Sequence, residues 1–288
     1  MSQIKVAVAT HDSLGESPVW DSKCGCLYWA DITGRLVHQW HPASDTRRSW
    51  ALEEKVGSIG LRASGGLVLA LRSGIGLFDI SDASCTFLVR LHADQPDMRF
   101  NDGRCDAAGC FWVGSMNDRT CGPEGSLYRF DPQHRLQEKL SGICIPNSLC
   151  WAPDGRTMYF SDSRQGVIWA FGVDRAGEIG SRRVFATITP PGVPDGATVD
   201  CEGFVWCALY GGWSVARFAP DGRLDRITRL PVQQPTSCAF GGPDLDTLYV
   251  TTARQGLDPD VLRHQPLAGD VLSLDPGVRG CVESRFAG

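Results

Sequence analysis

Hydrophobic and polar positions follow the same order six times along the chain: a polar residue, a short apolar run, a polar turn, and an aromatic or aliphatic run. Short apolar runs bounded by turn residues predict pairs of β-strands joined by tight turns. Weaker strand signals such as RLVHQWHP and GIGLFDI follow each pair. The six segments are ESPVWDSKCGCLYWAD (16–31), SIGLRASGGLVLAL (58–71), NDGRCDAAGCFWVGS (101–115), NSLCWAPDGRTMYFSD (147–162), DGATVDCEGFVWCAL (195–209) and SCAFGGPDLDTLYVTT (237–252).

The spacing of these segments indicates a β-propeller. Their first residues are separated by 42, 43, 46, 48 and 42 positions, and a period in the forties with a β pattern is typical of four-stranded propeller blades. A β-sandwich or a solenoid fits this period less well. We predict an all-β, six-bladed β-propeller of antiparallel blades around a central channel, with residues 1–288 as one domain. The spare N-terminal strand IKVAVA is expected to complete the last blade, so that no sheet edge stays open.

The residue that leads each segment is polar in every repeat. Because the innermost strand of each blade runs beside the channel, residues at one phase of the repeat are expected to form a ring there. Taken alone, each of them is better explained as a turn residue or a strand-start cap. Their recurrence at one phase is what favours a functional ring. The six residues are Glu16, Ser58, Asn101, Asn147, Asp195 and Ser237.

The ring offers the chemistry of a divalent-metal site. Carboxylate and amide oxygens suit Ca²⁺, Mg²⁺ or Mn²⁺ and also accept Zn²⁺ or Fe²⁺. Two carboxylates that converge without a cation would repel each other, so we expect one divalent cation at the ring. With open coordination positions, such an ion polarises a substrate carbonyl and lowers the pKa of bound water. The sequence contains no G-x-S-x-G, H-E-x-x-H or Walker-type glycine loop that would indicate a competing chemistry.

A cationic side chain accompanies the third ring residue. In RFND, Arg99 stands two positions before Asn101, and residues two apart on a strand point to the same side. The guanidinium and the amide are therefore expected to face one cavity, where arginine offers fixed donors to a polyhydroxylated or carboxylate-bearing ligand. An equally good interpretation is a surface arginine paired with Asp97 or Asp102.

Composition and charge narrow the function classes. The net charge is −5 and no Lys/Arg run is longer than a pair, so we expect no nucleic-acid partner. The N-terminus lacks a basic segment before a long apolar run, and no stretch of 18 apolar residues occurs. We therefore expect a cytoplasmic protein without membrane association. The twelve cysteines are scattered, which favours reduced thiols over a disulfide framework. The oligomeric state stays open.

Six ordered blocks of the chain resemble the family of senescence marker protein 30, also called regucalcin, with the gluconolactonases and other sugar lactonases. The resemblance covers nearly the whole chain and implies a six-bladed propeller with one divalent ion in its channel. It places metal ligands on Glu16, Asn147 and Asp195, substrate contacts on Arg99 and Asn101, and the general base also on Asp195. The blocks are LGESPVW, RFNDGRCDAAGCFWVGSM, PNSLCWAPDGRTMYFSDS, PDGATVDCEGFVWCALYGG, TSCAFGGPDLDTLYVTTAR and HQPLAGDVL.

One departure from the family pattern concerns substrate binding. After GSM, some members of the family carry a substrate-binding glutamate where this chain has NDRTCGPEGSLY. Asp118, Arg119 or Glu124 is expected to line that side of the site, and Arg119 is our candidate substrate-binding residue there.

The ring and the resemblance together lead to one functional hypothesis. It is a metal-dependent hydrolase that opens a sugar lactone to its aldonic acid in carbohydrate catabolism, with Ca²⁺ as the preferred ion and Zn²⁺, Mn²⁺, Mg²⁺ or Fe²⁺ as alternatives. Two other functions remain open: a metal-binding propeller without turnover, and a promiscuous esterase or phosphotriesterase that uses the same metal. Pentonolactones, hexonolactones and deoxy-sugar lactones are all reasonable substrates.

Overall fold

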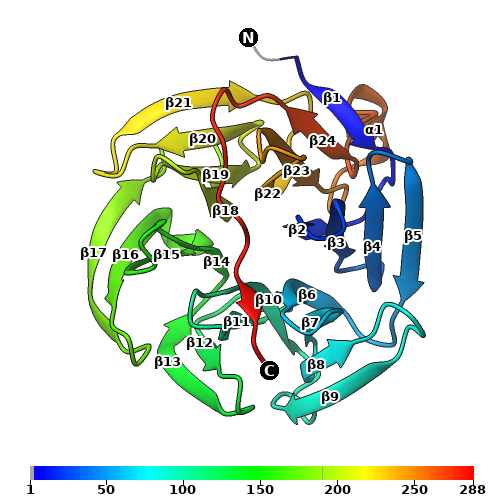
Figure 1. Cartoon of the computed structure of the whole chain (residues 1–288). Helices are drawn as coiled ribbons and strands as arrows, with labels where there is room; N and C mark the ends of the chain where they lie inside the picture. Colours follow the sequence, from blue (N-terminus) through cyan, green and yellow to red (C-terminus); the bar gives the residue numbers. More distant parts are fainter. Residues whose placement is uncertain (1–2, 190) are drawn as a thin grey trace.

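Strands make up nearly all of the regular structure in the computed structural model, which describes residues 3–189 and 191–288. They form six sheets arranged as a ring around a central channel (Figure 1). The predicted six-bladed β-propeller is confirmed. No helix in the described part of the chain has both the length and the apolar character that crossing a membrane requires. The helical segments of this part are η1 (Ser163–Gln165) and α1 (Pro259–His264).

We number the blades in chain order, and in each of the first three the strands run outward from the channel. Blade 1 consists of β2 (Gly15–Asp21), β3 (Cys26–Asp31), β4 (Leu36–His41) and β5 (Thr46–Ala51). Blade 2 consists of β6 (Val56–Arg62), β7 (Leu67–Leu71), β8 (Gly74–Phe78) and β9 (Cys85–Arg90). Blade 3 consists of β10 (Met98–Cys105), β11 (Phe111–Asn117), β12 (Gly125–Phe130) and β13 (Leu136–Ile143).

The other three blades repeat this order, and two short strands from the chain ends join the ring. Blade 4 consists of β14 (Pro146–Trp151), β15 (Thr157–Asp162), β16 (Val167–Val173) and β17 (Ile179–Thr187). Blade 5 consists of β18 (Val193–Val199), β19 (Val205–Tyr210), β20 (Ser214–Phe218) and β21 (Leu224–Arg229). Blade 6 consists of β22 (Pro235–Gly241), β23 (Thr247–Thr252), β24 (Val271–Leu274) and β1 (Lys5–Val8), and β25 (Arg285–Phe286) joins blade 2.

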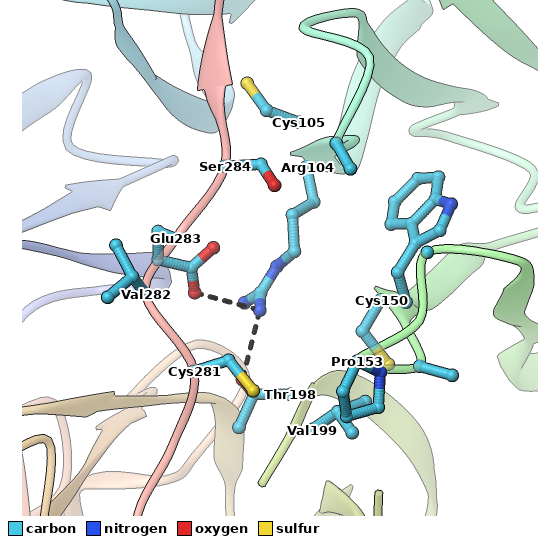
Figure 2. Close-up of a pocket in the computed structure, with 14 residues that line it drawn as sticks. Arg104, Cys105, Cys150, Pro153, Thr198, Val199, Cys281, Val282, Glu283 and Ser284 are labelled. Carbon is cyan, nitrogen blue, oxygen red and sulfur yellow. Dashed lines mark hydrogen bonds and ion pairs between the residues drawn. The ribbon is translucent and has the colours of Figure 1, made fainter. Parts of the chain in front are cut away.

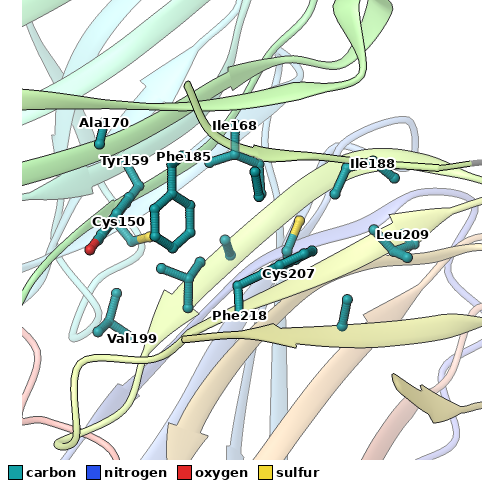
Figure 3. Packing of buried hydrophobic residues seen from close by; sticks show 14 residues of the cluster. Cys150, Tyr159, Ile168, Ala170, Phe185, Ile188, Val199, Cys207, Leu209 and Phe218 are labelled. Atoms are coloured by element: carbon teal, nitrogen blue, oxygen red, sulfur yellow. The ribbon is translucent and has the colours of Figure 1, made fainter. Parts of the chain in front are cut away.

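Apolar packing between neighbouring blades holds the ring together. Tyr159 and Phe185 of blade 4 pack with Phe218 of blade 5 in one buried cluster (Figure 3). Strands near the channel are covered on both faces, and all five residues of β7 are buried. The outermost strand β5 instead reads TRRSWA and is largely exposed. This gradient from apolar to charged strands is expected when sheets stack face to face and only their outer edges meet water.

The turn between the two inner strands is fixed by an aspartate in two of the blades. Asp106 accepts hydrogen bonds from the Cys110 backbone N–H at 2.9 Å and from the indole Nε1 of Trp112 at 2.7 Å. Asp200 binds the indole of Trp206 in the same way, at 2.9 Å. These aspartates lie five residues after the ring positions, so the polar turn of the repeat has a structural function.

The N-terminal strand closes the ring as predicted. Strand β1 pairs antiparallel with β24, with Lys5 opposite Ser273. Blade 6 is therefore built from both ends of the chain, and the edge of β24 is covered.

A second closure, made by the C-terminus, was not foreseen. Strand β25 pairs in parallel with β6, the innermost strand of blade 2, with Arg285 opposite Leu61. The Phe286 side chain is fully buried and stacks on Phe130 of blade 3 with ring centroids 5.5 Å apart. The guanidinium of Arg285 forms an ion pair with Asp21 of blade 1. The last residues thus connect three blades, and Figure 1 shows this segment in red crossing the ring.

This C-terminal segment covers the end of the channel where the innermost strands finish. Glu283 accepts a hydrogen bond from Arg104 at 3.1 Å, and Arg104 also donates to Thr198 at 3.1 Å (Figure 2). A cavity of about 120 Å³ lies there, between the segment and blades 3 to 5. The opposite end of the channel, where the innermost strands begin, is not covered by this segment and is accessible to ligands.

We predict that Phe286→Ala destabilises the protein by about 3–5 kcal/mol, because a buried aromatic ring is lost and a cavity remains. Urea unfolding of both proteins, followed by tryptophan fluorescence, measures this loss. The control is Val282→Ala, since Val282 lies in the same segment but is 66% exposed. If the two variants unfold at the same urea concentration, the segment does not contribute to stability as described.

Candidate functional site

Four of the six ring residues meet at the open end of the channel. Glu16, Asn101, Asn147 and Asp195 stand near the start of β2, β10, β14 and β18, and all four line one cavity of about 200 Å³. Each is at most 7% exposed. The structure thus brings together residues that are up to 179 positions apart in the sequence.

The other two ring residues, Ser58 and Ser237, do not line this cavity. Each instead faces a glycine of the neighbouring blade's innermost strand. A Cβ added to Gly103 would lie 2.6 Å from the Ser58 Oγ, and one added to Gly196 would lie 2.1 Å from the Ser237 Oγ. These two serines are small because the innermost strands approach each other closely there.

β-Bulges direct the cavity residues into the channel. The pairing register of β2 shifts between Glu16 and Val19, and that of β14 shifts between Asn147 and Cys150. In these two strands the residue after the ring position has left-handed backbone angles, with φ of 51° at Ser17 and 57° at Ser148. A bulge kinks a strand and changes the direction of its side chains, so these irregularities let the carboxylate and the amide face the cavity.

A chain of hydrogen bonds orients the two amides. Asn101 Nδ2 donates to the Asn147 Oδ1 at 3.1 Å and to the Pro146 carbonyl at 2.9 Å. Asn147 Nδ2 donates to the Ser163 Oγ at 2.8 Å, and this hydroxyl donates to the Pro194 carbonyl at 2.6 Å. Among the described residues, the Asn147 Oδ1 accepts only the hydrogen bond from Asn101, so the second of its two lone pairs is available to a further partner.

Arg99 lines the same cavity as Asn101 and is hydrogen-bonded to it. Its Nη1 donates to the Asn101 Oδ1 at 2.6 Å. Its Nε donates to the Asp118 Oδ1 at 2.6 Å, and the Asp118 Oδ2 lies 2.5 Å from the Lys55 Nζ. The carboxylate partner of Arg99 is therefore Asp118, and neither Asp97 nor Asp102 takes that place. Although burial alone would raise it, Arg99 and Lys55 lower the pKa of Asp118.

Of the three residues expected after GSM, the segment brings one, Asp118, to the cavity. Asp118 lines the cavity and Arg119 does not. The Arg119 side chain is 76% exposed and pairs with Asp97 at 3.2 Å. Glu124 accepts hydrogen bonds from Thr120 at the surface. The structure does not bring Arg119 or Glu124 to the other site residues, so substrate binding by Arg119 stays an untested prediction.

The two carboxylates of the cavity lie in an environment that resists their ionisation. Burial and the nearby Asp102 carboxylate raise the pKa of Glu16 to about 8. Burial, and next the Glu16 carboxylate, raise the pKa of Asp195 well above its ordinary value. Without a counterion, the ionised forms of both groups are strongly disfavoured.

These residues fit a divalent cation held by oxygen atoms. Two converging carboxylates and one amide oxygen with a free lone pair are hard ligands, and a cation among them would relieve the charge repulsion. In the described residues, no three His, Cys, Asp or Glu side chains form a metal-binding group. A site here therefore depends on Asn147 as its third protein ligand.

Sequence reasoning missed three residues of this site. Ser163, which follows β15, holds the Asn147 amide, and Asp102 raises the pKa of both cavity carboxylates. Tyr210, at the end of β19, lines the cavity. All three lie inside blocks that resemble the family, and this was their only sequence signal, because none of them stands at the ring phase.

Comparison with known proteins identifies the family. Residues 14–254 match the model of a protein family described as SMP-30/Gluconolactonase/LRE-like region. The chain belongs to this family of six-bladed propellers, as the sequence blocks had indicated.

Individual relatives match over the full length. Regucalcin of Xenopus laevis is 36% identical over 299 residues, covering 100% of both chains. A 6-deoxy-6-sulfogluconolactonase of Pseudomonas putida is 37% identical over 287 residues, covering 99% of each chain. The crystal structure of a calcium-binding protein, regucalcin, from Agrobacterium tumefaciens gives a TM-score of 0.95 at 31% identity, covering 100% of this chain and 98% of that one.

The raised pKa values predict how the stability of the metal-free protein depends on pH. The pKa of Glu16 is about 8 in the folded protein, against 4.5 as its ordinary value, so the folded state binds more protons than the unfolded state between these pH values. Raising the pH through this window should therefore lower the free energy of unfolding, by up to about 1.4 kcal/mol per pH unit for each extra proton.

Urea unfolding of chelator-treated protein at pH 5 to 8 measures this slope. Glu16→Gln should reduce it, since an amide does not titrate. Glu138→Gln, at an exposed position of β13, is the matched control and should keep the wild-type slope. Equal slopes in wild type and Glu16→Gln would show that Glu16 is ionised in the metal-free fold.

Proposed function

We propose that this protein is a divalent-cation-dependent lactonase that hydrolyses a sugar lactone to the corresponding aldonic acid. The main support is the cavity in which Glu16, Asn147 and Asp195 converge beside the Arg99 guanidinium and the Asn101 amide. A purely structural ion would not need these two polar groups beside it. The 6-deoxy-6-sulfogluconolactonase relative supports the same reaction class.

In this proposal, Glu16, Asn147 and Asp195 hold the cation. When bound, a divalent cation polarises the ester carbonyl of a lactone and makes a water molecule more acidic. Ca²⁺ is our preferred ion because carboxylate and amide oxygens are its usual ligands, and the Agrobacterium tumefaciens relative is described as calcium-binding. Zn²⁺, Mn²⁺, Mg²⁺ and Fe²⁺ remain compatible with the same oxygens.

The side chains around the proposed ion differ in function: one transfers a proton, two orient the substrate and others exclude water. Asp195 takes the proton of the attacking water, as a general base within the cavity. Arg99 and Asn101 orient the hydroxyl groups of the sugar, and their mutual hydrogen bond of 2.6 Å preorganises them for this task. Met116 and Ile145 form apolar parts of the wall and exclude water from the reacting face.

We further place the enzyme in carbohydrate catabolism in the cytoplasm. A sugar lactone is the product of oxidising an aldose at its anomeric carbon, so an aldose-oxidising reaction has to supply the substrate. The product is an aldonic acid, which the next enzyme consumes.

Asp195→Ala should lower kcat/KM on lactones by about 10²- to 10⁴-fold, because the variant lacks both a metal ligand and the general base. A pH indicator assay with gluconolactone, xylonolactone and galactonolactone measures this, after subtraction of spontaneous opening. Asp244→Ala, at an exposed position, is the control and should leave the rates unchanged. Wild-type rates in Asp195→Ala would refute the site.

Removal of the metal should abolish turnover and leave the β-rich fold in place. Chelator-treated protein is supplied with Ca²⁺, Zn²⁺, Mn²⁺, Mg²⁺ or Fe²⁺ in turn, and lactone hydrolysis and circular dichroism are recorded. We expect Ca²⁺ to restore the highest rate. Full activity in the chelated protein would disprove the metal dependence. Metal binding without any lactone turnover would favour a metal-binding propeller, and faster turnover of paraoxon-like esters would favour an esterase.

A further inference from the structure

A second cavity adjoins the site and has no function in the reaction described above. Its volume is about 440 Å³, and it shares two wall residues, Arg99 and Asp118, with the site cavity. The remaining wall comes from loops of blades 1, 2 and 3, including Arg35, Lys55 and Arg72. All of these loops lie at the end of the ring where the innermost strands begin.

The charges on this wall favour an anion. Four cationic side chains line it, and two of the three acidic residues there are engaged by cations or hydroxyls. The Asp118 carboxylate lies between Arg99 and Lys55. Glu54 accepts hydrogen bonds from the backbone N–H and the hydroxyl of Ser73 and lies near Arg72. The hydrogen-bond donors of this wall that remain free therefore belong mostly to positively charged side chains.

Two of the cations keep donors available for a ligand. The Lys55 side chain is 36% exposed and uses one proton for Asp118. Arg35 donates to the Glu53 backbone carbonyl at 3.3 Å. In the described residues, no carboxylate lies within ion-pair distance of the Arg35 guanidinium, so most of its five N–H groups are free.

We propose that this second cavity is a subsite for an anionic group at the end of the lactone that is remote from the ester carbonyl. This inference rests on the proposed lactonase function. Arg99 lies on the wall between the two cavities, so a sugar whose hydroxyls contact Arg99 directs its far end towards Lys55 and Arg35. The anion is a phosphate, a sulfonate or a carboxylate on the last carbon, since each accepts charge-assisted hydrogen bonds from lysine and arginine.

Glu53 is the group that opposes this assignment. It lines the same cavity, it is exposed, and in the part of the chain that the structure describes no hydrogen bond reaches its carboxylate. A negative charge at this position weakens the binding of an anion. Its removal should therefore act in the opposite direction to removal of Lys55 or Arg35, which distinguishes an effect of charge from an effect of packing.

The test compares lactones that differ only at the last carbon. These are glucono-1,5-lactone, its 6-phosphate and its 6-deoxy-6-sulfonate, and kcat/KM is measured for each after subtraction of spontaneous opening. We expect the wild type to prefer an anionic lactone over the neutral one by about tenfold or more. Comparison of kcat/KM for the 6-phosphate and the 6-deoxy-6-sulfonate shows which of these anions the subsite prefers.

Three variants and one control then test the residues. Arg35→Gln and Lys55→Met should each lower the ratio of anionic to neutral kcat/KM by about five- to tenfold, the scale of one charge-assisted hydrogen bond. Glu53→Gln should raise the ratio. Arg47→Gln removes the same charge from exposed strand β5 and should leave the ratio unchanged. A wild-type ratio near one, or a ratio unaffected in Arg35→Gln and Lys55→Met, overturns the subsite.

A binding measurement separates this proposal from the proposed function. If no lactone is hydrolysed, the lactonase proposal fails, and titration calorimetry with gluconate and 6-phosphogluconate still tests the subsite. Stronger binding of 6-phosphogluconate that is lost in Arg35→Gln supports it. Equal binding of the two acids overturns it.

Discussion

The central constraint on this structure is the burial of two carboxylates, Glu16 and Asp195, at one end of a rigid channel. Such a pair has to be protonated or has to bind a cation. The surrounding residues favour the binding of a cation. Bulges direct the side chains inward, Ser163 and Asn101 turn the Asn147 oxygen towards the cavity, and the apolar contacts between blades prevent the strands from separating. This packing holds the carboxylates close together, and a cation between them would relieve their repulsion.

Much of this arrangement was predictable from the sequence, for physical reasons. The period of the repeat sets the number of blades, and apolar runs flanked by turns mark the inner strands, so six polar residues could be assigned to a ring beside the channel. The choice of Glu16, Asn147 and Asp195 among them rested on the family resemblance. The periodicity of the sequence does not indicate in which direction a side chain points at a β-bulge. Ser58 and Ser237 share the phase of the ring but lie against glycines of the neighbouring blades, where no larger side chain would fit.

Other features depended on contacts that no local pattern records. Arg99 pairs with Asp118, 19 positions away, while the neighbouring Asp97 and Asp102 had been the obvious candidates. Arg119 follows Asp118 directly, yet its side chain leaves the cavity, because the chain turns just after β11. Strand β25 has only two residues, too few for any alternation of polar and apolar positions to predict a strand.

The double closure of the ring also affects how the protein is made. The last residues of the chain contact blades 1, 2 and 3, and the first strand pairs with β24 near the end of the sequence. Neither contact can form before the last strands of the propeller have left the ribosome. Individual blades can begin to fold earlier in synthesis, but the ring can close only once residues 271–286 are available. Until then the exposed edges of the unfinished blades are open to pairing with other chains, so this propeller is at greatest risk of aggregation in the interval before its ring closes.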